Sequence, residues 1–419
     1  MNLKNELTKL VDNKVISSAV ATDIENYYNN VPKNTNRLFT IFGVLGAALV
    51  GLGIILIIAH NWDIFPKAVK VFFAFLPLII GQVLVGYSIH KKKGTTWKES
   101  SGVFLFFAVG ACISLIAQVY NISGNLSKFL MTWILICTPL IYLLKSKNLV
   151  VLHLIFSTYY AMETGYNFFS VNYSPWFYFL FIGLIFPFYI QRIKENQKAN
   201  IVTLLNWLIP LSFIISFGSF IGEGYRFGYL LYVLMFGLLF NIGQELSFRQ
   251  FKPYQNGYML LGSAGILVLF MVASFDFIWE SQQYKSLNHG SFYLSMGVLF
   301  LNLVFIIYPF MKNEKRPFLI SSLAPFLFAV LFLIAQFDTL LPRIVINLFV
   351  FIWGVLMIYE GMKKLDFSMS NFGLLIVTAL VICRFFDSDM SFVVRGVLFL
   401  CVGAGFFATN YFMLKKLKE

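Results

Sequence analysis

The sequence predicts an all-α membrane protein: a polytopic transmembrane helical bundle of about fourteen spans with both termini cytoplasmic, preceded by a short cytoplasmic helical hairpin. Composition is the first reason, because 59% of the 419 residues are apolar and only 12% are charged, about half the usual ~25%. The second is that apolar runs of spanning length follow one another from Leu38 to Leu414, separated by short polar gaps. One water-soluble core could not bury so much apolar surface, so lipid must be the solvent for most of it.

Each apolar run is close to the ~20 residues that a ~30 Å hydrocarbon layer requires. Helices are expected, because lipid offers no partner for an unpaired backbone group and the runs lack the alternation of barrel strands. The predicted spans are 38–60, 68–89, 99–120, 128–144, 149–163, 175–190, 201–220, 227–245, 257–277, 290–311, 318–336, 343–361, 371–385 and 392–414. The fifth and thirteenth are short, and each is expected to be tilted, kinked or only partly inserted.

The basic residues predict the orientation. If the N-terminal segment, every second gap and the C-terminal tail are cytoplasmic, these segments hold 24 of the 32 Lys and Arg. A missed or extra span would scramble this alternation, so the pattern supports the span number as well. The net charge of +13 is spread a few residues at a time over these gaps, which predicts topology and no nucleic-acid binding.

Residues 1–37 form the predicted hairpin, and residues 38–419 form the transmembrane domain. Leu7 and Leu10 follow helical spacing, and Ser17 or Ser18 is expected to cap a second helix that runs through Tyr28. This hairpin either lies against the cytoplasmic face or docks a protein partner.

The four cysteines, Cys112, Cys137, Cys383 and Cys401, lie inside apolar spans and are predicted to be small buried hydrophobes. Soluble-enzyme signatures such as G-x-x-x-x-G-K-[ST], H-E-x-x-H and C-x-x-C are missing from the sequence, and the four histidines have no metal-binding spacing. We therefore expect no metal and no cofactor.

Candidate ligand-binding residues are polar groups at or within the membrane, where they are costly. Those chosen are Asn61, Trp62, Asp63, Gln118, Tyr120, Asn121, Glu163, Gln336, Asp338, Arg343, Arg384 and Asp387. The alternative is structural: amides bond neighbouring helices, acids remain at the outer surface and arginines reach it by snorkelling. Glu163 lies among Tyr159, Tyr160 and Tyr166, which predicts either an aromatic belt or a cation cage. If a site exists, Asp63 should pair with Arg343, Arg384 or Arg395 beside a cavity that continues past Gln118.

Three features in order carry a resemblance. They are the polar N-terminal hairpin, the segment Ala59-His60-Asn61-Trp62-Asp63 with Pro66, and the segment Leu115-Ile116-Ala117-Gln118-Val119-Tyr120-Asn121-Ile122. Over about residues 3–145 the chain resembles a bacterial predicted membrane protein family of unknown function, domain of unknown function 2157. The resemblance implies a bacterial inner-membrane location and brings no activity.

A weak internal echo suggests a duplicated four-span unit, residues 38–144 and 257–361. The segment Phe107-Ala108-Val109 with Ile116-Ala117-Gln118 returns as Phe328-Ala329-Val330 with Ile334-Ala335-Gln336. The copies are eight spans apart, so they would be parallel repeats. Chance matching of apolar sequence is the alternative.

The function expected from these features is transport or binding of a small solute or lipid through a polar path between helices. Its partners would be membrane lipids and a small-molecule solute or lipid headgroup. The alternatives are a membrane enzyme acting on a lipid-linked substrate and an envelope assembly or interaction protein.

Overall fold

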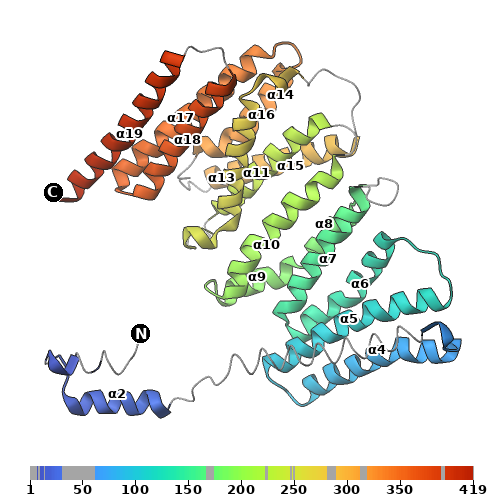
Figure 1. The fold of residues 1–419 in the computed structure, drawn as a ribbon. Coiled ribbons are helices and arrows are strands. Elements are labelled where there is room, and N and C mark those ends of the chain that lie inside the picture. Colours follow the sequence, from blue (N-terminus) through green and yellow to red (C-terminus); the bar gives the residue numbers. More distant parts are fainter. Residues whose placement is uncertain are drawn as a thin grey trace. The chain divides into compact units, whose positions relative to one another are not determined.

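The computed structural model describes residues 7, 10–13, 15–30, 62–166, 174–221, 225–245, 248, 251–280, 289–311, 319–387 and 392–418. Every regular element in these ranges is a helix, which confirms the predicted all-α class (Figure 1). The chain divides into two units, residues 1–73 and 74–419, each described by itself. The first predicted span, 38–60, lies outside the described residues, so the four-span duplication stays a prediction.

The first unit contains α2 (Ser18–Asn30) and the short 3₁₀ helix η1 (Trp62–Ile64). The hydroxyl of Ser17 accepts a hydrogen bond from the amide of Val20 at 3.3 Å, so Ser17 caps the helix, as one of the two predicted serines. Leu7 is buried, and Val15 and Val20 are exposed. Docking of a partner on this hairpin stays a prediction.

Thirteen predicted spans fall on helices that the structure describes. In order these helices are α4 (Lys67–His90), α5 (Thr95–Val119), α6 (Leu126–Leu144), α7 (Lys147–Gly165), α8 (Phe177–Gly183), α9 (Phe186–Glu195), α10 (Asn200–Phe217), α11 (Tyr225–Gly243), α13 (Gly257–Ala273), α15 (His289–Met311), α16 (Leu319–Ile334), α17 (Leu340–Lys364), α18 (Phe367–Asp387) and α19 (Phe392–Lys418). The sixth span is divided between α8 and α9. Short helices η2 (Gly218–Phe220), η3 (Pro253–Gln255) and α14 (Asp276–Glu280) lie in the connections.

Seven helices in the described part of the chain are long and apolar enough to cross a membrane. They are Lys67–His90, Thr95–Val119, Leu126–Leu144, Phe177–Glu195, Asn200–Phe220, Leu340–Lys364 and Phe367–Arg384. Five shorter apolar helices lie within α11, α13, α15, α16 and α19. Fourteen spans and the cytoplasmic position of both ends stay predictions.

The fifth predicted span is a continuous helix, α7, of 19 residues. It packs against α5, α6, α8 and α10, so other helices cover most of its surface. This position explains its polar content: His153 and Ser157 are buried, and their hydrogen bonds go to neighbouring protein atoms. A helix surrounded by protein need not present an apolar face to lipid.

Several pairs of helices approach closely at glycines. In the hairpin of α17 and α18, a Cβ on Gly373 would lie 2.7 Å from the carbonyl oxygen of Gly354, and one on Gly361 would lie 2.5 Å from the amide of Ser370. A larger residue at either glycine would therefore force the helices apart.

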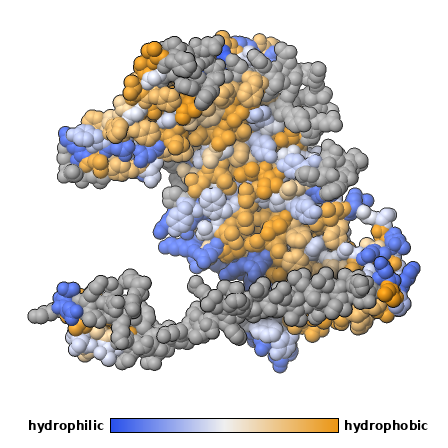
Figure 2. Space-filling view, viewed as in Figure 1, coloured by the Kyte–Doolittle hydropathy of each residue, from blue (hydrophilic) through white to orange (hydrophobic). Residues whose placement is uncertain are grey.

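Two contacts connect helix ends to neighbouring turns. The turns after α6 and α9 meet where Arg192 contacts Lys145, and the start of α10 meets η3 where Asn206 contacts Gln255. In Figure 1 the turns that follow α6, α9 and α17 lie along one side of the second unit. Figure 2 shows hydrophobic side chains over much of the visible face of this unit and hydrophilic ones at several helix ends.

The predicted burial of all four cysteines is wrong in part. Cys112 and Cys137 are buried, Cys383 is half-buried, and Cys401 is exposed. Cys401 lies on α19, which packs against α17 and α18 and leaves another face uncovered.

Candidate functional site

The candidate residues predicted at the end of the first span belong to the first unit, and the other candidates belong to the second. Asn61 lies outside the described residues. Trp62 and Asp63 lie on η1, Asp63 is exposed, and the ammonium of Lys70 lies 5.8 Å from the centroid of the Trp62 ring. Since the two units are described separately, the pairing of Asp63 with an arginine stays a prediction.

Gln118, Tyr120 and Asn121 terminate α5. All three are exposed, and Asn121 has the left-handed φ of 50° that asparagine tolerates at a helix end. The amide of Ile122 donates to the carbonyl oxygen of Ala117 at 2.8 Å and closes the turn. These three residues therefore end α5. None of them lines the apolar groove that lies over α11.

Glu163 lies in the last turn of α7 and is buried. Two of the three tyrosines near Glu163 in sequence contact other helices. The ring of Tyr160 packs edge-on against that of Phe181, with 5.2 Å between the ring centroids, and the hydroxyl of Tyr166 donates to the carbonyl oxygen of Ile215. These contacts join α7 to α8 and α10. The cation cage stays a prediction.

Arg384 of α18 and Asn347 of α17 both contact Ser274 at the end of α13. Arg384 donates to the hydroxyl of Ser274 at 3.1 Å, and its guanidinium lies 5.0 Å from the ring of Phe275. Asn347 donates to the carbonyl oxygens of Ser274 at 3.2 Å and Arg343 at 2.8 Å. These contacts join α13 to α17 and α18, and a ligand-binding role for the two arginines, Arg343 and Arg384, stays a prediction.

The other candidates on this side have local partners. The carboxylate of Asp338 accepts from the amide of Leu340 at 2.8 Å at the start of α17. The amide of Gln336 donates to the carbonyl of Phe332, four residues earlier, at 3.4 Å. Asp387 is the last residue of α18, and its side chain lies outside the described part. Their role in binding a ligand stays a prediction.

Deeper amides bond one helix to another. Asn241 of α11 donates to Asn302 of α15 at 3.0 Å, and Gln244, just after α11, donates to Ser322 of α16 at 2.7 Å. All four side chains are buried. This is the structural alternative that the sequence left open for the buried amides.

A groove of about 960 Å³ lies over α11, between α8–α9 on one side and α15 on the other. Its floor is buried and includes Met235 and Leu239 of α11, whereas Phe186, Ile190 and Tyr293 on its walls are exposed. The volume is at the upper end of the roughly 300–1,000 Å³ range of ligand sites. Lys194 is the one ionised side chain in its lining.

The groove is long. It extends along α8 and α9 from Trp176 to Lys194, which at ~1.5 Å per residue is about 27 Å of helix, close to the ~30 Å of a hydrocarbon layer. Phe217 of α10 and Phe248 also line it. Apart from Lys194, polar atoms in the lining come from tyrosine, tryptophan and backbone.

The wall formed by α8 and α9 is a broken helix. Pro187 has no amide hydrogen and lies in the first turn of α9, where proline is tolerated, while Leu184 and Ile185 form the break. Carbonyls that the break releases find side-chain donors: Nε2 of His153 donates to Phe181 at 2.9 Å, and the hydroxyl of Tyr142 donates to Leu184. Such replacement is required where backbone inside a membrane leaves its helix.

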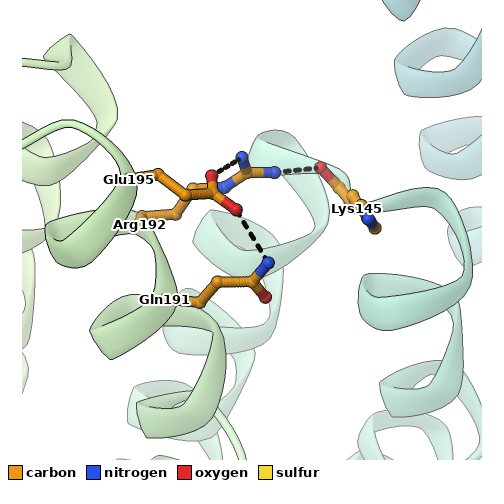
Figure 3. Close-up of polar contacts among 4 residues, drawn as sticks. All are labelled: Lys145, Gln191, Arg192 and Glu195. Carbon is orange, nitrogen blue, oxygen red and sulfur yellow. Dashed lines mark hydrogen bonds and ion pairs between the residues drawn. The ribbon is translucent and has the colours of Figure 1, made fainter.

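Charged groups gather at the end of α9, next to the groove. Figure 3 shows the guanidinium of Arg192 between the carboxylate of Glu195, at 2.6 Å, and the carbonyl oxygen of Lys145, at 3.2 Å. Gln191 donates to the other carboxylate oxygen of Glu195 at 2.7 Å. Arg192 thus places a positive charge at the C-terminal end of α6, where the helix dipole favours a cation.

The other side of the same turn is held by an acid. The carboxylate of Glu99, on α5, accepts from the amides of Lys147 at 2.8 Å and Asn148 at 3.1 Å, and also from the hydroxyl of Ser146. These amides begin α7, where the dipole favours an anion. The α6–α7 turn is therefore fixed by one charge of each sign, from α9 and from α5.

Sequence reasoning did not find the groove. Its apolar walls have the composition of lipid-facing helix, so no residue in them stands out. The local signals were Pro187 inside an apolar run and Lys194 at its end, which is also one of the basic residues that predict the orientation.

These helices define a helical membrane protein. A model of the family described as "Predicted membrane protein (DUF2157)" matches residues 8–150, which confirms the resemblance seen in the sequence. No curated protein and no solved structure matches the chain. The matched part includes α4, α5 and α6, whereas the groove is formed by residues beyond it. The function of the groove must therefore be argued from its geometry.

Proposed function

We propose that this membrane protein binds a membrane lipid by holding an acyl chain in the groove over α11. The groove carries the proposal: it is about 960 Å³ in volume and apolar along its length, and the helix Phe177–Glu195 on one side is long and apolar enough to cross a membrane. Burial of apolar surface is the interaction that such a lining offers.

The shape of the groove supports an acyl chain over a compact solute. Its lining runs for most of the thickness of a hydrocarbon layer, and its walls are exposed at Trp176, Ile190 and Leu301. A chain could therefore enter sideways from the bilayer. A polar solute would find few partners there, because the buried amides of α11 and α15 bond each other.

The test fills the groove at Gly297 of α15. A Cβ at this glycine would meet nothing within 4 Å, so phenylalanine there would project into the groove with little strain on the backbone. The control is Gly86→Phe on α4, where a Cβ also meets nothing within 4 Å and the residue is outside the groove lining.

The full chain is purified in detergent, and bound lipid is counted by native mass spectrometry. We expect Gly297→Phe to retain at least tenfold less lipid than the unaltered protein and Gly86→Phe to retain the same amount. Thermal unfolding checks that both variants are folded. Equal lipid retention in a folded Gly297→Phe protein would contradict acyl-chain binding in this groove.

A further inference from the structure

A second hollow, of about 380 Å³, lies beside the cytoplasmic end predicted for the groove. It is lined by Pro187, Ile190, Gln191, Lys194 and Glu195 of α9. Ile190 and Lys194 also line the groove, so the two spaces share the same residues along one helix. The smaller one also has the polar side chains of Gln191 and Glu195 in its lining.

The charges around this hollow favour an anion. The carboxylate of Glu195 is occupied by Arg192 at 2.6 Å and by Gln191 at 2.7 Å. Lys194 is exposed, and among the described residues no carboxylate forms a salt bridge with it. Arg192, Lys194 and Glu195 together carry one net positive charge.

We propose that this hollow takes the phosphate of an anionic phospholipid whose acyl chain lies in the groove, with the ammonium of Lys194 as its partner. This proposal rests on the proposed function and adds the class of lipid. The arrangement matches an amphiphile: apolar space extends away from Lys194 on one side, and a polar hollow lies on the other. A phosphate at this level would lie among the basic turns of the predicted cytoplasmic side, where anionic lipid is attracted.

The experiment compares two lipids with identical chains, dioleoyl phosphatidylglycerol and dioleoyl phosphatidylcholine, mixed in equal amounts in nanodiscs that hold the full chain. Native mass spectrometry after release into detergent measures the ratio of the two lipids retained by the protein. One cation at a membrane surface should favour the anionic lipid about fivefold.

Lys194→Gln should bring this ratio close to one while the total lipid retained stays unchanged, and Lys194→Arg should keep the preference. The matched control is Lys198→Gln, an exposed lysine three residues beyond the end of α9 that lines neither space. It should keep the fivefold preference.

Two results would overturn the phosphate site: no preference in the unaltered protein, or a preference that survives Lys194→Gln. Dioleoyl phosphatidylethanolamine retained as well as phosphatidylglycerol would also overturn it, because the proposal requires net negative charge. The proposed function has a separate test: if the groove does not bind an acyl chain, Gly297→Phe will retain as much lipid as the unaltered protein.

Discussion

Asn302 shows what a buried amide does in this chain. Its nitrogen donates to the carbonyl oxygens of Leu234 and Val298, both at 2.9 Å, and its oxygen accepts from Asn241. All of its polar atoms are thus used within the bundle. Gln118, an equally polar amide at the end of α5, is exposed. From the sequence, Gln118 lies at the outer end of a predicted span and Asn302 deeper within one, and most such amides are expected to bond a neighbouring helix.

We predict that Asn302→Leu lowers the free energy of unfolding by about 0.6 to 2 kcal/mol. The physical reason is that leucine cannot accept from Asn241 or donate to Leu234, so the hydrogen bonds that join α15 to α11 at this position are lost. Unfolding in detergent, followed by tryptophan fluorescence, measures the change, and Gln118→Leu is the control with no expected loss. Equal stabilities for Asn302→Leu and the unaltered protein would show that this bond does not hold α11 to α15.

The hairpin of α17 and α18 shows how the helices are brought together. Leu365 takes a left-handed φ of 56° at the end of α17, and the carboxylate of Asp366 accepts from the amide of Met369 at the start of α18. Beyond this turn the helices touch at Gly354 and Gly373. Backbone contact of this kind depends on the missing side chains.

Gly373→Leu should therefore destabilise the protein by about 1–3 kcal/mol, the usual cost of overpacking, or prevent folding. Gly86→Leu, at a glycine with open space around it, should change stability little. Thermal unfolding and gel filtration in detergent compare the two. A Gly373→Leu protein as stable as Gly86→Leu would contradict the close approach of α17 and α18.

For whole helices, the sequence predicted where each helix lies along the chain, but not which of its faces points into the bundle. The bounds of α15, predicted as 290–311 and found as His289–Met311, follow from where apolar residues begin and end. Which face of a helix points inward depends on asymmetry around its axis, and a uniformly apolar helix has little. The groove between α9 and α15 could not be foreseen for that reason, although Lys194 and Pro187 were both visible.

For the whole molecule, the basic turns predict which side faces the cytoplasm. The contacts of Arg192 with Lys145 and of Glu99 with Ser146 bring three basic segments together at one end of the helices. The charge alternation assigns this end to the cytoplasm. The opposite end holds the α5–α6 turn, which includes Gly124.

Cysteine labelling tests this assignment. In a background without the four native cysteines, Gly124→Cys should react with an impermeant maleimide in intact cells, and Lys92→Cys should react only after permeabilisation. Both positions are exposed in the structure, so protection of either one reports the membrane and not burial in the protein. Labelling of Lys92→Cys alone in intact cells would reverse the orientation.

The α6–α7 turn also implies an order of assembly during synthesis. Glu99 precedes the turn in the chain, so the start of α7 can acquire its anionic partner as soon as it leaves the ribosome. Arg192 follows two helical segments later, and until then the end of α6 lacks its cation. Helices α5, α6 and α7 can therefore associate first, and the arrival of α9 would complete the turn and close one wall of the groove in a single event.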